Sequence, residues 1–121
     1  MKTFKQFFAE QASTRSLDEV LELFKPFVQK ELGIQKLPPI KIVKGEDAQQ
    51  MKAFGCWDGE SVTLCPDGRH PMDVMRTLAH ELVHHSHNHT NGEDGSDDEN
   101  EANAKAGVIM RRFAREYPNL F

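Results

Sequence analysis

Apolar residues recur at helical spacing between Ser16 and Gly33. The segment Ser16-Leu17-Asp18-Glu19 has the form of an N-terminal capping box, and Gly33 is a typical residue to follow a helix end. Pro26 lies inside this stretch, so we expect a kink or a break in the helix there. The apolar face that predicts the helix consists of Val20, Leu21, Phe24, Phe27 and Val28.

A second apolar stripe, of Phe4, Phe7 and Phe8, predicts a short amphipathic helix over residues 3–11. Such a helix packs on its own core or binds a partner, and we favour packing because apolar stripes are usually buried. Residues 1–10 contain no uninterrupted apolar run and no small-residue cleavage site, so no signal peptide is predicted. We therefore expect an intracellular, cytoplasmic protein.

Three short segments have the pattern of β-strands. Residues 40–43 are β-branched around one lysine, and residues 53–57 and 61–65 flank Asp58-Gly59, a pair typical of a two-residue hairpin turn. The sequence therefore predicts one strand followed by a β-hairpin.

The hairpin turn also predicts the state of the two cysteines. A two-residue turn would pair Cys56 with Ser61 and Cys65 with Lys52, so the thiols would not face each other. Their spacing fits neither a disulfide framework nor a paired zinc site. We expect both thiols to be free in a reducing compartment.

Two further helices are predicted in the C-terminal half. Pro71 suits the first position of a long helix that reaches about His87, and residues 88–98 are polar and acidic, as in a loop. Asp97 or Asp98 can cap a last helix that runs through Arg115. The expected buried faces are Met75, Leu78, Ala79 and Leu82 on the first of these helices, and Ala102, Ala106, Ile109 and Phe113 on the second.

These elements predict an α+β protein. A chain of 121 residues fits a single domain, 1–121, with one modest core. We expect an N-terminal helical segment of about residues 1–33 and a core of strands and helices over about residues 38–117.

The charge of the chain limits the classes of partner. The formal net charge is −4, and no basic stripe is present to neutralise phosphates, so we expect no nucleic-acid partner. No long apolar run indicates a membrane segment. The acid is concentrated between Glu93 and Glu101, which carry six carboxylates between them and no basic residue.

The segment His80-Glu81-Leu82-Val83-His84 predicts a metal site. Histidines four residues apart on a helix lie about 40° apart around the axis and about 6 Å along it, so both rings can reach one ion. Zinc suits such a pair. Glu81 stands at the edge of the same face, where its carboxylate can act as a general base on a water molecule.

The other histidines fit less well. His87 lies about 10 Å from His80 along the axis, too far to share one ion with the first pair. His85 and His89 form another pair with a spacing of four on a different face, and solvated surface histidines are the more common outcome there.

The third ligand must come from elsewhere. In the metzincin pattern a glycine and a third histidine follow the second histidine, but His87 and Thr90 occupy those positions here. Glu101, in the first turn of the last helix, is the favoured carboxylate ligand, and Glu99 is the alternative. Asp94, Asp97 and Asp98 can orient a ligand imidazole or can simply form a solvated loop.

Three segments together resemble the gluzincin peptidases, and among them the small ImmA/IrrE-like group. They are Ser61-Val62-Thr63-Leu64, Thr77-Leu78-Ala79-His80-Glu81-Leu82-Val83-His84 and Glu99-Asn100-Glu101-Ala102-Asn103. The similarity covers about residues 54–113. The sequence departs from that group at His84-His85-Ser86-His87, where the group has apolar residues, and it contains no helix-turn-helix domain.

The resemblance implies a zinc metallopeptidase with one Zn²⁺ per chain, held by His80, His84 and Glu101, with Glu81 as the catalytic base. It also implies a minimal zincin-like fold, in which a small three-stranded mixed sheet covers the active-site helix and its edge strand pairs with an extended protein or peptide substrate. We expect a monomer. The alternative is a non-catalytic zinc-stabilised binding or assembly protein with the same fold.

Two points stay open in the sequence. His70, His85 and Tyr117 can each donate a hydrogen bond to an oxyanion, but the sequence does not select among them. The opening Met1-Lys2-Thr3-Phe4-Lys5-Gln6-Phe7 resembles the start of several proteins of large tailed bacteriophages. That similarity would imply a phage-encoded enzyme, active in the host cytoplasm or in the virion.

Overall fold

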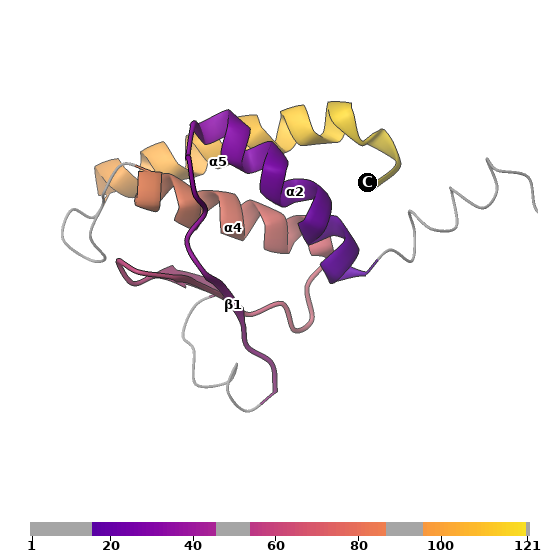
Figure 1. Ribbon diagram of the computed structural model, residues 1–121, viewed down its shortest axis with the longest axis horizontal. Helices are drawn as coiled ribbons and strands as arrows, with labels where there is room; N and C mark the ends of the chain where they lie inside the picture. The colour runs from indigo at the N-terminus through magenta and orange to yellow at the C-terminus, as the bar shows by residue number, and fades with distance from the viewer. Residues whose placement is uncertain (1–15, 46–53, 87–95, 121) are drawn as a thin grey trace, which may run out of the picture.

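The computed structural model describes residues 16–45, 54–86 and 96–120, with side chains from residue 99 onward in the last of these segments (Figure 1). The helix expected over residues 3–11 lies outside these residues, as do His87 and His89. The elements are the helices α2 (Leu17–Leu32), α4 (Pro71–Ser86) and α5 (Ser96–Glu116), the strands β1 (Ile40–Ile42), β2 (Gly55–Trp57) and β3 (Val62–Leu64), and the short 3₁₀ turn η1 (Pro118–Leu120).

Helix α2 begins and ends where its capping residues predict. The Ser16 side chain accepts a hydrogen bond from the Glu19 backbone N–H at 3.3 Å, and Gly33 follows the helix in the left-handed conformation, with φ 66°. Pro26 does not end the helix, which continues to Leu32. The buried face of α2 therefore extends over both sides of the proline.

The three strands form a mixed sheet in the order β1-β3-β2. Strand β3 lies in the centre, parallel to β1 and antiparallel to β2. This arrangement confirms the α+β fold with a small mixed sheet, and it leaves β2 at one edge.

The register of the hairpin differs from the sequence prediction. Trp57 pairs with Val62 and Cys56 with Thr63, so the loop has four residues, 58–61, rather than two. The Asp58 carboxylate accepts hydrogen bonds from the backbone N–H groups of Glu60 and Ser61, at 2.8 and 2.7 Å, and these bonds stabilise the longer loop. A shift of two residues keeps every side chain on its predicted face, because the side-chain period of a strand is two.

The cysteines do not face each other in this register. The Cys65 backbone N–H donates to the Phe54 carbonyl, while Cys56 lies opposite Thr63, and both thiols are free. The predicted free thiols are thus confirmed, although the predicted pairing partners are wrong.

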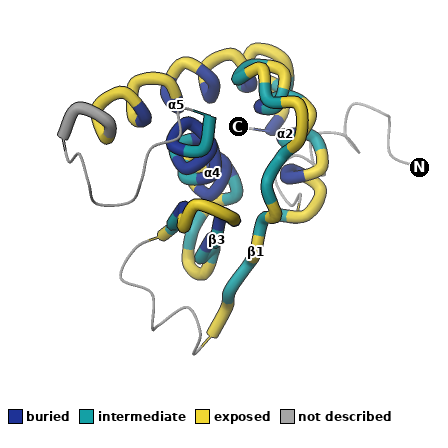
Figure 2. The backbone as a smooth tube through the Cα atoms, turned by 60° about the vertical axis from the view of Figure 1, so that its left-hand side comes forward, coloured by how far each residue is buried: buried dark blue, intermediate teal, exposed yellow. Residues whose placement is uncertain are grey.

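Helix α4 lies between the sheet and the other two helices. Figure 1 shows the strands on one side of α4, and α2 and α5 on the other, and Figure 2 shows that α4 is the most deeply buried of the helices. Buried residues therefore surround it rather than form one stripe, as expected of a central helix. They include the predicted Met75, Leu78, Ala79 and Leu82, and also Met72, Val74, Val83, Glu81 and His84.

Helix α5 covers α4 and also contacts α2. Its predicted stripe of Ala102, Ala106, Ile109 and Phe113 is buried. The ring of Phe24 from α2 meets that of Phe113 edge to face, with centroids 4.9 Å apart, and the aromatic pair joins the two outer helices. None of the described helices is both long and apolar enough to cross a lipid bilayer.

Candidate metal centre

Helix α4 brings the two predicted histidines together. The Nε2 atoms of His80 and His84 lie 3.2 Å apart, one helical turn from each other on the same face. His84 is nearly inaccessible, with 7% of its side chain exposed, and His80 is 18% exposed. The two Nε2 atoms are therefore close enough to bind one ion, and solvent reaches them mainly on the side of His80.

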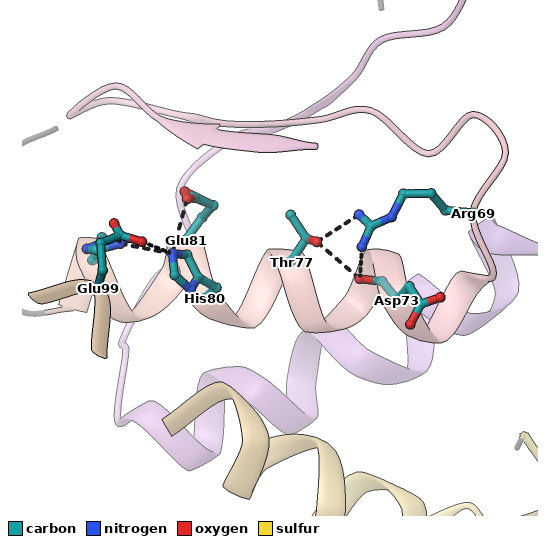
Figure 3. A network of polar contacts seen from close by, with 7 residues as sticks. Arg69, Asp73, Thr77, His80, Glu81 and Glu99 are labelled. Carbon is teal, nitrogen blue, oxygen red and sulfur yellow. Dashed lines mark hydrogen bonds and ion pairs between the residues drawn. The ribbon is translucent and has the colours of Figure 1, made fainter. Parts of the chain in front are cut away.

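Helix α5 supplies a carboxylate to the same position. The Oε1 atom of Glu99 lies 2.9 Å from His84 Nε2, and its Oε2 atom lies 3.1 Å from His80 Nε2 (Figure 3). Each of the two oxygens thus faces one imidazole. The carboxylate is half-exposed and spans the open side of the histidine pair.

Of the two acids considered for this position, the structure brings Glu99 to the histidines and leaves Glu101 exposed on α5. The reason is that the two acids lie on different faces of α5, and only one of these faces is directed at the histidines. Glu99 precedes the buried Ala102 by three residues and lies beside it, whereas Glu101 is about 200° around the axis from Glu99. Glu99, the alternative acid of the sequence prediction, is thus the one that contacts the histidines.

The structure does not describe the side chains of the other three acids that were considered in this region. Asp94 lies outside the described residues, and Asp97 and Asp98 belong to the first turn of α5 without described side chains.

Glu81 is the buried acid of the site. Its residue is 7% exposed, its Oε1 atom lies 3.9 Å from His80 Nε2, and its Oε2 atom has no hydrogen-bond partner in the described part of the chain. Burial raises the pKa of the Glu81 carboxyl, and the Glu99 carboxylate raises it further, while His80 opposes the rise. A buried oxygen without a partner calls for a ligand or a water molecule at that place.

His80, Glu81 and His84 form a group that could hold a metal ion, with ligand atoms within 4.8 Å of one another. The two carboxylates near the histidines, those of Glu81 and Glu99, lie at different distances from the imidazole nitrogens. The Glu99 oxygens approach the imidazoles to 2.9 and 3.1 Å, whereas Glu81 stays at 3.9 Å. The Glu99 oxygens therefore lie closer to the imidazole nitrogens than the Glu81 carboxylate does.

A groove of about 540 Å³ passes in front of these residues. Its walls come from the edge strand β2, from α4 and from α5. The lining residues are Phe54, Gly55, Cys56, Arg76, Thr77, His80, Glu81, Glu99 and Asn103.

Strand β2 lies very close to α4 beside this groove. A Cβ atom added at Gly55 would come 2.5 Å from Thr77 Cγ2, so any other residue there would force the strand or the Thr77 side chain to shift. The Thr77 hydroxyl accepts a hydrogen bond from Arg69 at 2.8 Å and donates one to the Asp73 carbonyl at 3.1 Å (Figure 3). The Arg69 guanidinium also lies over the Phe54 ring, 4.2 Å from its centroid.

Cys56 lines the groove but is not suited to react. Burial raises the pKa of its thiol, and the charges of Glu81 and Asp58 raise it further. The thiol therefore stays protonated at neutral pH, which disfavours both metal binding and nucleophilic attack.

The three residues considered as oxyanion donors have different positions. His70 precedes the first turn of α4, where its Nδ1 accepts a hydrogen bond from the Met72 N–H at 3.0 Å. His85 packs edge to face on Trp57, with centroids 4.7 Å apart. Tyr117 follows α5 and packs against Phe113, about 27 Å along the axis from Glu99. The structure does not bring His70 or Tyr117 to the histidine pair.

Sequence reasoning missed Phe54, Arg76 and Asn103 as residues of the groove. A signal for the last two was present, because Arg76 stands four residues before His80, and Asn103 stands four residues after Glu99. That spacing places each on the same helical face as a residue of the site.

Comparison of the chain with protein-family models, with curated proteins and with solved structures gives no match.

Proposed function

We propose that this protein is a zinc-dependent metallopeptidase in which His80, His84 and Glu99 hold the metal and Glu81 is the general base. The observation that carries the proposal is the convergence of two imidazoles and one carboxylate beside a second, buried carboxylate. Such a set of three ligands plus a base is typical of hydrolytic zinc sites.

The spacing of the donor atoms supports one ion shared by the two helices. The Nε2 atoms of His80 and His84 lie 3.2 Å apart, and each has a Glu99 oxygen beside it, Oε2 at 3.1 Å from His80 and Oε1 at 2.9 Å from His84. Imidazole nitrogen and carboxylate oxygen are both ligands that zinc prefers, so these three residues would hold it.

Three protein ligands are the number that hydrolytic zinc sites use, and His80, His84 and Glu99 would provide them. When bound, zinc supplies a Lewis acid that lowers the pKa of a water molecule to about 7 and polarises a carbonyl oxygen. Glu81, whose buried Oε2 atom has no hydrogen-bond partner among the described residues, would accept a proton from water there and would give it to the leaving amine nitrogen. Burial raises the pKa of the Glu81 carboxyl, which makes it a stronger base than an exposed glutamate and so suits the acceptance of a proton.

The open edge of the sheet supports a peptide as the substrate. Phe54 is hydrogen-bonded across to Cys65, so in the alternating antiparallel pattern Cys56 also faces β3, while the backbone groups of Gly55 and Trp57 face outward. An extended peptide can pair with that free edge along the groove. The carbonyl of such a peptide would then lie near His80 and Glu81, which line the same groove.

The mechanism is tested with Glu81→Gln and His84→Ala. Glu81→Gln keeps one zinc per chain, measured by elemental analysis after gel filtration, and loses hydrolysis of a mixed peptide library by at least about 100-fold, since base catalysis is worth that much. His84→Ala loses the metal as well as the activity. Full hydrolysis by Glu81→Gln would overturn the role of the base, and absence of bound zinc in the wild type would overturn the proposal.

A non-catalytic zinc-stabilised binding or assembly protein is the second candidate. It is favoured by one observation, that neither His70 nor Tyr117 lies at the histidine pair to stabilise an oxyanion. In that case cobalt substituted for zinc would give the absorption spectrum of a closed four-ligand site, unchanged by added azide. An enzyme site would instead bind the azide at its open position.

A further inference from the structure

We propose that Arg76 makes the groove select peptides that carry a carboxylate on the C-terminal side of the cleaved bond. This inference rests on the proposed peptidase function and specifies its substrate class. It starts from the position of the guanidinium group relative to the histidines.

Arg76 stands one helical turn before His80 on α4 and lines the same groove. Its side chain extends toward α5, where the position that a Cβ atom at Gly107 would occupy lies 3.9 Å from Arg76 Nη2. The same position lies 3.5 Å from Nη1 of Arg111. Two guanidinium groups from different helices therefore both lie near Gly107, and the one from α4 also lines the groove.

Within the part of the chain that the structure describes, no hydrogen bond or ion pair joins Arg76 or Arg111 to an acid. Arg112, the next residue on α5 after Arg111, in contrast forms an ion pair with Glu31 at 2.8 Å. Two like charges on this face favour an anion, and a carboxylate that contacts Arg76 would form charge-assisted hydrogen bonds with its guanidinium group.

The direction of β2 assigns this position to one end of a bound peptide. Gly55 lies against Thr77, and Trp57 lies against His85, so β2 runs in the same sense as α4. A peptide that pairs antiparallel with β2 runs the opposite way, and antiparallel pairing is the more common and the more stable kind. Its C-terminal part would then lie at the end of the groove where Arg76 stands.

The carboxylate can belong to an Asp or Glu side chain or to the free C-terminus of a short peptide. Both sources present the same planar group to a guanidinium fork. The two are distinguished by comparing peptides with amidated C-termini and peptides with free C-termini.

The first experiment maps cleavage sites. The zinc-loaded full chain is incubated with a library of N-blocked, randomised peptides, amidated or free at the C-terminus, and the new N-termini are sequenced by mass spectrometry. We expect Asp and Glu to be enriched about threefold to fivefold after the cleaved bond, the upper range for a partly exposed ion pair. Arg76→Gln removes the enrichment and Arg76→Glu shifts it to Lys and Arg, whereas the exposed control Arg115→Gln keeps the wild-type profile.

The second experiment measures binding without turnover. In the zinc-loaded Glu81→Gln background, fluorescein-labelled peptides that differ only by Glu or Gln are titrated by fluorescence anisotropy. The Glu peptide should bind about threefold more tightly, and the difference should vanish with Arg76→Gln and shrink as NaCl is raised.

The outcomes separate the inference from the proposed function. Cleavage without acidic enrichment, enrichment only before the cleaved bond, or an unchanged profile in Arg76→Gln overturns the inference and leaves the peptidase intact. Absence of cleavage with an Arg76-dependent preference for the Glu peptide overturns the peptidase and supports the anion-binding groove. Absence of both cleavage and preference overturns both.

Discussion

The Oε1 atom of Glu99 lies 2.9 Å from Nε2 of His84, although the two residues belong to different helices. The contact depends on how α5 covers α4. Ala102, three residues after Glu99, is fully buried, so the Glu99 side chain lies beside the packed stripe and reaches over its edge. The candidate metal site is therefore formed by helix packing as much as by the motif on α4.

This relationship predicts different metal affinities for two variants. Glu99→Gln should weaken zinc binding at least about 100-fold, because it removes a directly bonded charged ligand, and even the loss of an outer partner costs about 10–100-fold. Glu101→Gln serves as the matched control and should bind zinc as the wild type does. Competition with a chromophoric chelator measures both. The opposite order would restore Glu101 as the third ligand.

Glu81→Gln should stabilise the metal-free protein at neutral pH. The pKa of Glu81 is raised in the folded state, so folding disfavours the charged form above the ordinary pKa of 4.5. Removal of that charge should raise the free energy of unfolding by about 1 kcal/mol. Urea denaturation in the presence of a chelator measures the change, and a loss of stability in Glu81→Gln would contradict it.

Gly55→Ala should disturb the contact between β2 and α4. The added Cβ would meet Thr77 Cγ2 at 2.5 Å, and overpacking of this kind costs about 1–3 kcal/mol of unfolding free energy. Thr77→Ser removes the opposing methyl group and keeps the hydroxyl that bonds Asp73 and Arg69. The double variant should therefore recover most of the stability, as a double-mutant cycle would show. Additive losses would place the strain elsewhere.

Asp58 should make the stability of the hairpin depend on pH. The backbone N–H groups of Ser61 and Glu60 lower the pKa of its carboxyl below the ordinary 3.8. Its contribution is thus fully present above that unfolded value and is lost as the pH falls through the lower folded value. Asp58→Asn should be less stable than the wild type at neutral pH, and the gap should close in strong acid.

Thermal unfolding followed across the pH range tests this expectation. Glu60→Gln controls for the loss of a charge in the same loop. A gap between Asp58→Asn and the wild type that does not narrow in acid would exclude the charge as its cause.

Local patterns in the sequence determined the helices and their buried faces. The capping residues Ser16 and Gly33 bound α2 as predicted, and the apolar stripe of α5 is buried as predicted. The pair His80 and His84 could be recognised because an interval of four residues on one helix fixes which side chains share a face. These features depend only on neighbours along the chain.

Tertiary structure decided the hairpin register, the third acid and the groove. The four-residue loop after Trp57 depends on hydrogen bonds of the Asp58 side chain that compete with a two-residue turn. The choice between Glu99 and Glu101 depends on how α5 is rotated against α4, and Arg76 comes near Arg111 only because these helices pack side by side. The sequence pattern predicts which residues share a face of each helix. The angle at which one helix packs against another depends on the packing of the whole core.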